Sequence, residues 1–169
     1  MKNTIYLVLA MLIVSCSATT SATSQSTTMK KKTLKGTWSL TDIRFIGEEG
    51  LYKADLFGIA DSPCYKGGEW MFIPNNGTGR FSINGSERCQ EGTHRILWTF
   101  HEAGDGTTQL QFKLVDTKNK PLSGDKSGYR MIIKSLTETK TVFMVEVDYK
   151  GKPFDVELTL DKVSKDVTL

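Results

Sequence analysis

The sequence has few of the residues from which active sites and metal centres are usually built. It contains 3 cysteines and 2 histidines in 169 residues, and none of the motifs G-x-S-x-G, H-E-x-x-H or G-x-x-x-x-G-K. His94 and His101 are an odd number of residues apart on one expected strand, which places them on opposite faces. We therefore predict that the protein is not an enzyme and that it has no catalytic residues, cofactor or metal site.

Strong charge and long hydrophobic runs are also lacking. The formal net charge is only +3, and no basic stripe with interleaved aromatic residues is present, so we expect no nucleic-acid partner. The longest apolar run, residues 5–14, is too short to cross a bilayer core of roughly 30 Å. With nucleic-acid binding and a membrane-spanning segment excluded, we consider an exported or anchored domain with a modest surface charge.

The apolar run near the N-terminus has the layout of a secretory signal peptide. Lys2 supplies a positive charge before the run, and the small residue Ser15 follows it directly before Cys16. An ordinary secretory signal with a chance cysteine and an uncleaved anchor are the alternatives. The stretch resembles the lipobox of bacterial lipoproteins, which implies that Cys16 is lipidated and becomes the mature N-terminus.

This resemblance divides the chain and predicts its location. Residues 1–15 are the expected signal peptide, residues 16–32 a lipidated Ser/Thr-rich tether, and residues 33–169 the folded domain. The lipid would attach the protein to a membrane. Because residues 17–28 contain no acidic residue, similarity to Bacteroidetes lipoproteins implies a place in the cell envelope, on the periplasmic face of the outer membrane.

Two cysteines remain within the domain. An even pair in an exported domain favours a disulfide, here between Cys64 and Cys89, which would contribute about 3 kcal/mol. Two free thiols are the alternative. A zinc site formed by these cysteines with His94 and His101 is a further alternative, although the spacing matches no usual pair of zinc ligands.

From Gly36 onward the hydrophobic pattern has a period of two. Phe154, Val156, Leu158 and Leu160 alternate with polar residues, which is typical of a strand with one wet face. Turn residues such as Asn84-Gly85 separate the runs. The expected strands are residues 36–46, 69–74, 79–84, 93–102, 108–116, 128–136, 141–149 and 153–162.

Eight short antiparallel strands in succession predict an all-β, up-and-down barrel. Closing the sheet removes the exposed edges that such a chain would otherwise have. A two-sheet sandwich is the competing arrangement. An eight-stranded barrel has an interior that side chains fill or that holds one small ligand.

One connection is unusually long and apolar. Residues 48–66 include Leu51, Tyr52, Leu56 and Phe57, and apolar residues in so long a loop favour a lid or a short helix that packs on the domain. By contrast, residues 117–127 are polar, as in an ordinary surface loop.

Three features of the domain occur together: Gly36-Thr37-Trp38 at the start of the first expected strand, the long apolar loop after it, and Trp98 in the fourth expected strand. In these features the sequence resembles the lipocalin-like family of bacterial lipoproteins, in which G-x-W begins the first strand and a large first loop covers the barrel mouth. The sequence departs from the family in one respect: the arginine that covers the tryptophan near the end of the barrel is missing, and only Lys162 is available there. The resemblance implies a lipocalin-like barrel over residues 34–163.

Two functions fit such a barrel. In the first, inward aromatic and methionine side chains line a cavity for a small hydrophobic ligand. The candidates are Trp38, Trp70, Phe72, Phe81, Trp98, Phe112, Met131 and Met144. The same side chains at period two would equally fill a core. In the second, a filled barrel acts as a structural subunit or inhibitor that contacts an envelope protein through its loops.

Overall fold

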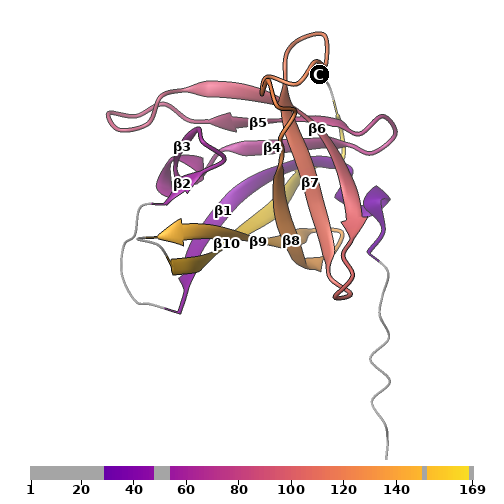
Figure 1. Ribbon diagram of the computed structural model, residues 1–169. Coiled ribbons are helices and arrows are strands. Elements are labelled where there is room, and N and C mark those ends of the chain that lie inside the picture. The colour runs from indigo at the N-terminus through magenta and orange to yellow at the C-terminus, as the bar shows by residue number, and fades with distance from the viewer. Residues whose placement is uncertain (1–28, 48–53, 150–151, 168–169) are drawn as a thin grey trace, which may run out of the picture.

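The chain folds into a closed antiparallel barrel (Figure 1). The computed structural model describes residues 29–47, 54–149 and 152–167, so Cys16 and most of the expected tether lie outside the described residues. The barrel strands are β1 (Gly36–Ile46), β4 (Glu69–Ile73), β5 (Thr78–Ile83), β6 (Gly92–Glu102), β7 (Thr108–Val115), β8 (Tyr129–Leu136), β9 (Lys140–Tyr149) and β10 (Lys152–Ser164). The predicted eight-stranded barrel is therefore confirmed, and the sandwich is not formed.

The strands follow one another around the barrel as an up-and-down meander. The order is β1-β10-β9-β8-β7-β6-β5-β4, and β1 closes the ring because it pairs with both β10 and β4. Trp38 lies opposite Lys162 on one side and Trp70 on the other. The pairing of β1 with β4 stops at Ser39, so the second half of β1 leaves β4 and continues with β10 alone.

Gly36 has a defined role at the point of closure. Its φ of +126° lies in a region that side chains rarely adopt, and a Cβ at this position would lie 2.3 Å from the Ser164 carbonyl oxygen. Only glycine lets β10 approach β1 so closely. The glycine of the Gly36-Thr37-Trp38 motif is thus explained by the backbone contact that closes the barrel.

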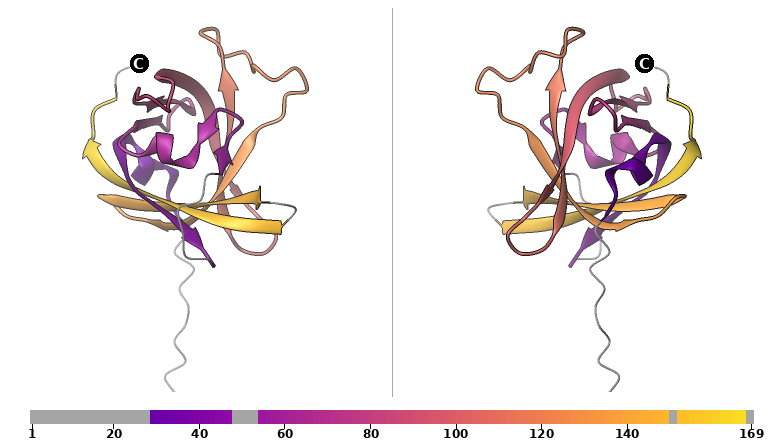
Figure 2. Two further views of the ribbon diagram at one scale, coloured as in Figure 1. Left: turned by 90° about the vertical axis from the view of Figure 1, so that its left-hand side faces the viewer. Right: turned by 90° about the vertical axis from the view of Figure 1, so that its right-hand side faces the viewer.

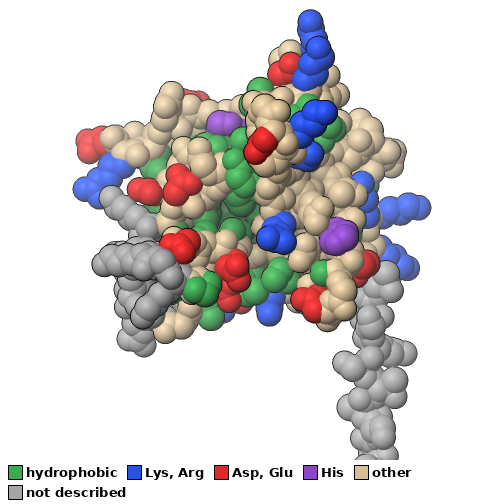
Figure 3. All heavy atoms as spheres, viewed as in Figure 1, with side chains coloured by type: hydrophobic (Ala, Val, Ile, Leu, Met, Phe, Trp, Pro, Cys, Tyr) green, Lys and Arg blue, Asp and Glu red, His purple; other side chains and the backbone are tan. Residues whose placement is uncertain are grey.

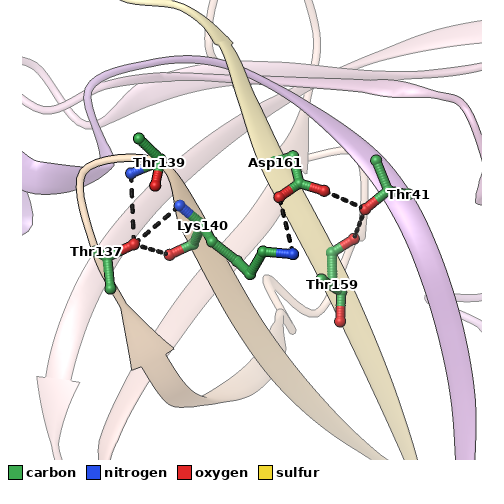
Figure 4. Close-up of polar contacts among 6 residues, drawn as sticks. All are labelled: Thr41, Thr137, Thr139, Lys140, Thr159 and Asp161. Atoms are coloured by element: carbon green, nitrogen blue, oxygen red, sulfur yellow. Dashed lines mark hydrogen bonds and ion pairs between the residues drawn. The ribbon is translucent and has the colours of Figure 1, made fainter.

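A polar cluster on the outer face links β1, β10 and β9 (Figure 4). The Thr41 hydroxyl donates to Asp161 Oδ2 over 2.7 Å, at a register shift between β1 and β10, and Lys140 Nζ pairs with Asp161 Oδ1 at 3.1 Å. In the turn between β8 and β9, Thr137 Oγ1 accepts from the Lys140 amide over 2.9 Å. The hydrogen bond from Thr41, followed by the contact with Lys140, holds the pKa of Asp161 below its usual value.

The two ends of the barrel are covered differently (Figure 2). At one end, which we call the mouth, the connection after β1 forms a separate two-stranded sheet of β2 (Asp55–Leu56) and β3 (Ala60–Asp61), followed by the 3-10 helix η2 (Ser62–Tyr65). We call residues 54–65 the lid segment. At the other end lies the 3-10 helix η1 (Lys31–Leu34), which includes two lysines that the sequence analysis placed in the tether.

The η1 end is closed by specific contacts. Trp38 Nε1 donates to the Leu34 carbonyl oxygen over 2.8 Å. Lys162 Nζ lies 4.4 Å from the centre of the Trp38 ring and donates to the Thr33 carbonyl oxygen over 3.0 Å. Lys162 therefore covers Trp38 in the way that the family resemblance assigns to an arginine. Lys31 Nζ lies in the same manner 4.5 Å from the Trp98 ring.

Candidate functional site

Seven of the eight proposed interior residues lie in the barrel core. All seven are buried and belong to one hydrophobic cluster. They are Trp38, Trp70, Phe72, Phe81, Trp98, Phe112 and Met131. Met144 is the exception, because it alternates with the buried residues Phe143 and Val145 and is itself only partly buried. Met144 thus lies on the outer face of β9, and its prediction as an interior residue is wrong.

The interior candidates divide between the two ends. Trp38 and Trp98 lie at the η1 end, where the lysines cover them. Toward the mouth, five aromatic rings surround one further ring, that of Phe57. We call these five the aromatic cage: Tyr65 from η2, Trp70 from β4, Phe81 from β5, Phe112 from β7 and Tyr129 from β8.

Phe57 fills the cage from the lid segment. Its ring centre lies 5.0 Å from that of Phe112, 5.5 Å from that of Tyr129 and 5.7 Å from that of Tyr65. Four of its five ring contacts are edge-on, the geometry that aromatic quadrupoles favour. The aromatic cage is therefore complementary to a single aromatic ring.

The backbone that carries Phe57 is strained. Phe57 and Gly58 both have φ of 62°, and the Ile59 amide donates back to the Leu56 carbonyl oxygen over 3.2 Å. Turns with positive φ at both central positions favour Asn-Gly or Gly-Gly, and a bulky residue there costs about 1 kcal/mol or more. The Asp55 carboxylate stabilises the turn by accepting from the Gly58 amide over 2.8 Å.

Other residues of the long connection are placed only in part. Leu51 and Tyr52, two of the proposed lid residues, lie outside the described residues. Leu56 is buried beside Phe57. The Tyr65 hydroxyl donates to the Leu56 carbonyl oxygen over 2.7 Å, and burial raises its pKa far above the usual range for tyrosine, with a further contribution from the charge of Asp55. The hydroxyl of Tyr65 thus stays neutral and holds the lid segment.

The predicted disulfide between Cys64 and Cys89 is confirmed, with 5.5 Å between the Cα atoms. It links η2 at the end of the lid segment to the connection between β5 and β6. The disulfide therefore fixes one end of the lid segment to the barrel wall, while the β2–β3 turn belongs to a sheet separate from the barrel.

A hollow of about 500 Å³ lies beside the lid segment at the mouth. Its lining includes Gly58 and Ile59 of the lid segment, the disulfide, and His94 of β6. The His94 ring stacks on Phe81 with 5.0 Å between centres, and partial burial lowers the pKa of His94. His94 thus contacts both the hollow and one wall of the aromatic cage.

Hydrophobic side chains are also partly exposed around the mouth, and Figure 3 shows such side chains gathered on this face. They pack against the core without being covered completely. They are Ile43, Phe45, Ile59, Tyr129, Val147 and Phe154. Figure 3 also shows acidic side chains close to the hydrophobic ones.

Two buried side-chain polar atoms have no hydrogen-bond partner among the described residues. They are Trp70 Nε1, on a side chain that is 1% exposed, and Ser62 Oγ in η2. Buried donors almost always have partners in folded proteins, so an exception calls for a physical explanation. The unpartnered Trp70 Nε1 belongs to a residue of the aromatic cage, and the unpartnered Ser62 Oγ belongs to the lid segment.

The sequence analysis missed two residues of the aromatic cage. Tyr129 lies two positions before Met131 on β8, so the same alternation that selected Met131 also indicates Tyr129. Tyr65 lies in a connection without periodicity, and only its position next to Cys64 could have suggested that it packs inward. Strand periodicity thus finds the walls of the barrel but not the residues of the lid segment.

Some kinds of site have no counterpart in the described part of the chain. Across residues 29–47, 54–149 and 152–167, no group of three His, Cys, Asp or Glu side chains is placed to hold a metal ion. No helix in these ranges is long and apolar enough to cross a membrane.

No protein-family model matches the chain, and no curated protein matches it. Solved structures do resemble it. Bovine odorant-binding protein in complex with its natural ligand has a TM-score of 0.41 and 17% identity, covering 83% of this chain and 76% of that chain. The same protein in complex with undecanal has a TM-score of 0.39 and 16% identity, with the same coverage. At this level the likeness is limited to the fold.

Proposed function

We propose that the protein binds a small, ring-containing apolar ligand in the aromatic cage, and that the β2–β3 turn moves outward to admit it. The observation that carries this proposal is the position of Phe57. A bulky side chain is held in a strained turn, and its ring occupies a cage of five other rings. Phe57 occupies the volume that the ligand would take.

The attachment of the lid segment supports such a movement. β2 and β3 pair only with each other, so releasing the turn breaks no strand pairing of the barrel. The disulfide at Cys64 holds the η2 end during the movement. The partly exposed apolar side chains around the mouth would give an apolar molecule a surface on which to approach the cage.

The experiment compares naphthalene binding by the full chain and its Phe57→Ala variant in equilibrium dialysis. We expect the wild-type protein to bind naphthalene and the variant to bind about tenfold more tightly, because no side chain must first leave the cage. Phe100→Ala is the matched control. Phe100 contacts Trp98, outside the aromatic cage, and its removal should leave the affinity unchanged.

A different result would favour another function. If neither the wild-type protein nor Phe57→Ala binds naphthalene, the aromatic cage is only a core. The filled barrel would then be better explained as a structural or inhibitory subunit that contacts an envelope protein through its loops.

We also propose that Cys16 carries the lipid that attaches the protein to the outer membrane, facing the periplasm. This proposal rests on the sequence of residues 1–28 alone. We expect the wild-type protein to partition into the detergent phase with the mass of a lipidated N-terminus, and Cys16→Ser to lose that modification. Protease added to intact cells should leave the protein uncut, and cutting it would place the protein on the cell surface.

A further inference from the structure

The three tryptophans differ in how their buried indole N–H groups are satisfied. Trp38 Nε1 donates to the Leu34 carbonyl oxygen over 2.8 Å, and Trp98 Nε1 donates to the Thr78 carbonyl oxygen over 2.7 Å. Trp70 Nε1 is equally buried but has no partner among the described residues. Such a donor is costly to leave unpaired, and a group that pairs with it is correspondingly favoured.

The unpaired donor belongs to a wall of the proposed ligand site. The Trp70 indole is stacked on Phe81 with 4.5 Å between ring centres and lies 6.1 Å from the centre of Phe57. A molecule that replaces the Phe57 ring therefore contacts the indole. Phe57 offers no acceptor, and Trp70 Nε1 has no partner among the described residues while the lid segment fills the cage.

The surroundings also determine the charge of the acceptor. The aromatic cage consists of uncharged aromatic side chains, and the Tyr65 hydroxyl is already engaged as a donor to Leu56. A carboxylate placed here would be buried without a counter-charge, which is strongly unfavourable. A neutral oxygen acceptor can pair with one N–H at no such cost.

We propose that Trp70 Nε1–H selects ligands that combine an apolar ring with a neutral carbonyl oxygen, that is, aromatic ketones and aldehydes. This inference rests on the proposed function, because it requires a ligand in the aromatic cage. It makes Trp70 a specificity-determining residue, whereas Phe81 and Phe112 select only for apolar shape.

The test uses two probes of nearly equal shape, 2-acetylnaphthalene and 2-isopropenylnaphthalene, in which a carbonyl oxygen is replaced by a methylene group. We expect the wild-type full chain to bind the ketone about tenfold more tightly than the alkene in equilibrium dialysis, as one satisfied hydrogen bond allows. Trp70→Phe should bind the two probes with equal affinity, because it lacks the indole N–H. Trp98→Phe, whose N–H is already paired, should keep the tenfold preference.

The outcomes separate this inference from the proposed function. If the wild-type protein binds both probes with equal affinity, the selection by Trp70 is wrong while ligand binding stands. If it binds neither probe, both are wrong.

A measurement on the wild-type protein covers the case in which Trp70→Phe fails to fold. Of the three indole N–H resonances from Trp38, Trp70 and Trp98, the ketone should shift one strongly downfield, and the alkene should not. Equal shifts from the two probes would contradict the inference.

Discussion

The two ends of the barrel use the same kinds of residue for different purposes. At the η1 end, both tryptophan N–H groups are paired, and Lys162 and Lys31 lie over the two indole rings. At the mouth, the third tryptophan has an unpaired N–H, and the ring that fills the space beside it comes from a strained turn. The buried indole donors are paired at the η1 end and unpaired at the mouth. This is the pattern expected where separate regions of a protein provide stability and binding.

The difference implies that opening the mouth costs less free energy than opening the η1 end. Opening the η1 end would break buried hydrogen bonds and two cation–π contacts. Opening the mouth would break the buried hydrogen bond from the Tyr65 hydroxyl to the Leu56 carbonyl oxygen, but it would relieve a backbone strain and break no strand pairing of the barrel. Elements that move on binding are drawn from the less stable parts of a fold, and the β2–β3 turn meets that description.

The largest effect is expected when a buried phenylalanine ring is removed, once from the barrel wall and once from the lid segment. Phe72→Ala, on β4, should lower the free energy of unfolding by about 4 kcal/mol, because a barrel strand cannot collapse onto the space left behind. Phe57→Ala should cost less than half as much, because the lid segment can shift locally. Chemical denaturation followed by tryptophan fluorescence measures both, and equal losses would contradict the contrast.

Strain at Phe57 is tested by a second substitution at the same position. Phe57→Gly should be more stable than Phe57→Ala by about 1 kcal/mol, since glycine adopts a φ of 62° without strain. Glycine is normally the less stable of the two in regular structure. An alanine variant that is as stable as the glycine variant would show that the turn is relaxed.

The effect expected from loss of the disulfide is second only to that of Phe72→Ala. Replacing both Cys64 and Cys89 by serine should lower the free energy of unfolding by about 3 kcal/mol, because the link closes a loop of 25 residues in the unfolded chain. Hydrogen exchange should rise mainly in the lid segment, residues 54–65, while the η1 end keeps its protection. A uniform rise in exchange over the barrel would mean that the disulfide stabilises the whole fold rather than the mouth.

A smaller effect is expected at the η1 end. Lys162→Met should lower the free energy of unfolding by about 1 kcal/mol, because it removes the cation over Trp38 and the donor to the Thr33 carbonyl oxygen. Lys162→Arg should retain most of the stability, because it keeps a cation at the same place. If the methionine variant matches the wild-type protein, hydrophobic contact alone closes this end.

The inner faces of the barrel strands could be predicted from the sequence, but the residues of the lid segment could not. The alternation along β10 has the same period as the pleat of a strand, so local residues determined its inner face. On β9, Val142 and Met144 make the first half of both faces apolar, which led to the wrong prediction for Met144. Glu146 and Asp148 lie further along the same face as Met144, and their charge indicates that this face points outward.

The site itself depended on features that no periodic pattern carries. Phe57 could be recognised as an apolar residue of a long loop, but its depth in the barrel follows from the positive φ of its turn and from contacts with distant strands. The unpaired N–H of Trp70 is invisible in the sequence, because its two counterparts are paired with carbonyl oxygens of other segments. Fold and site were therefore unequally predictable.

The smallest expected effect concerns pH at the mouth. Partial burial lowers the pKa of His94 below its ordinary value of 6.5, so the unfolded chain takes up a proton at this histidine before the folded protein does. The contribution of neutral His94 to stability is thus complete above pH 6.5 and declines as the pH falls through the interval between 6.5 and the lowered pKa. His94→Gln should flatten that part of a plot of unfolding free energy against pH. If the variant retains the slope, another group titrates there, and His94 does not link the aromatic cage to the pH of the surrounding solution.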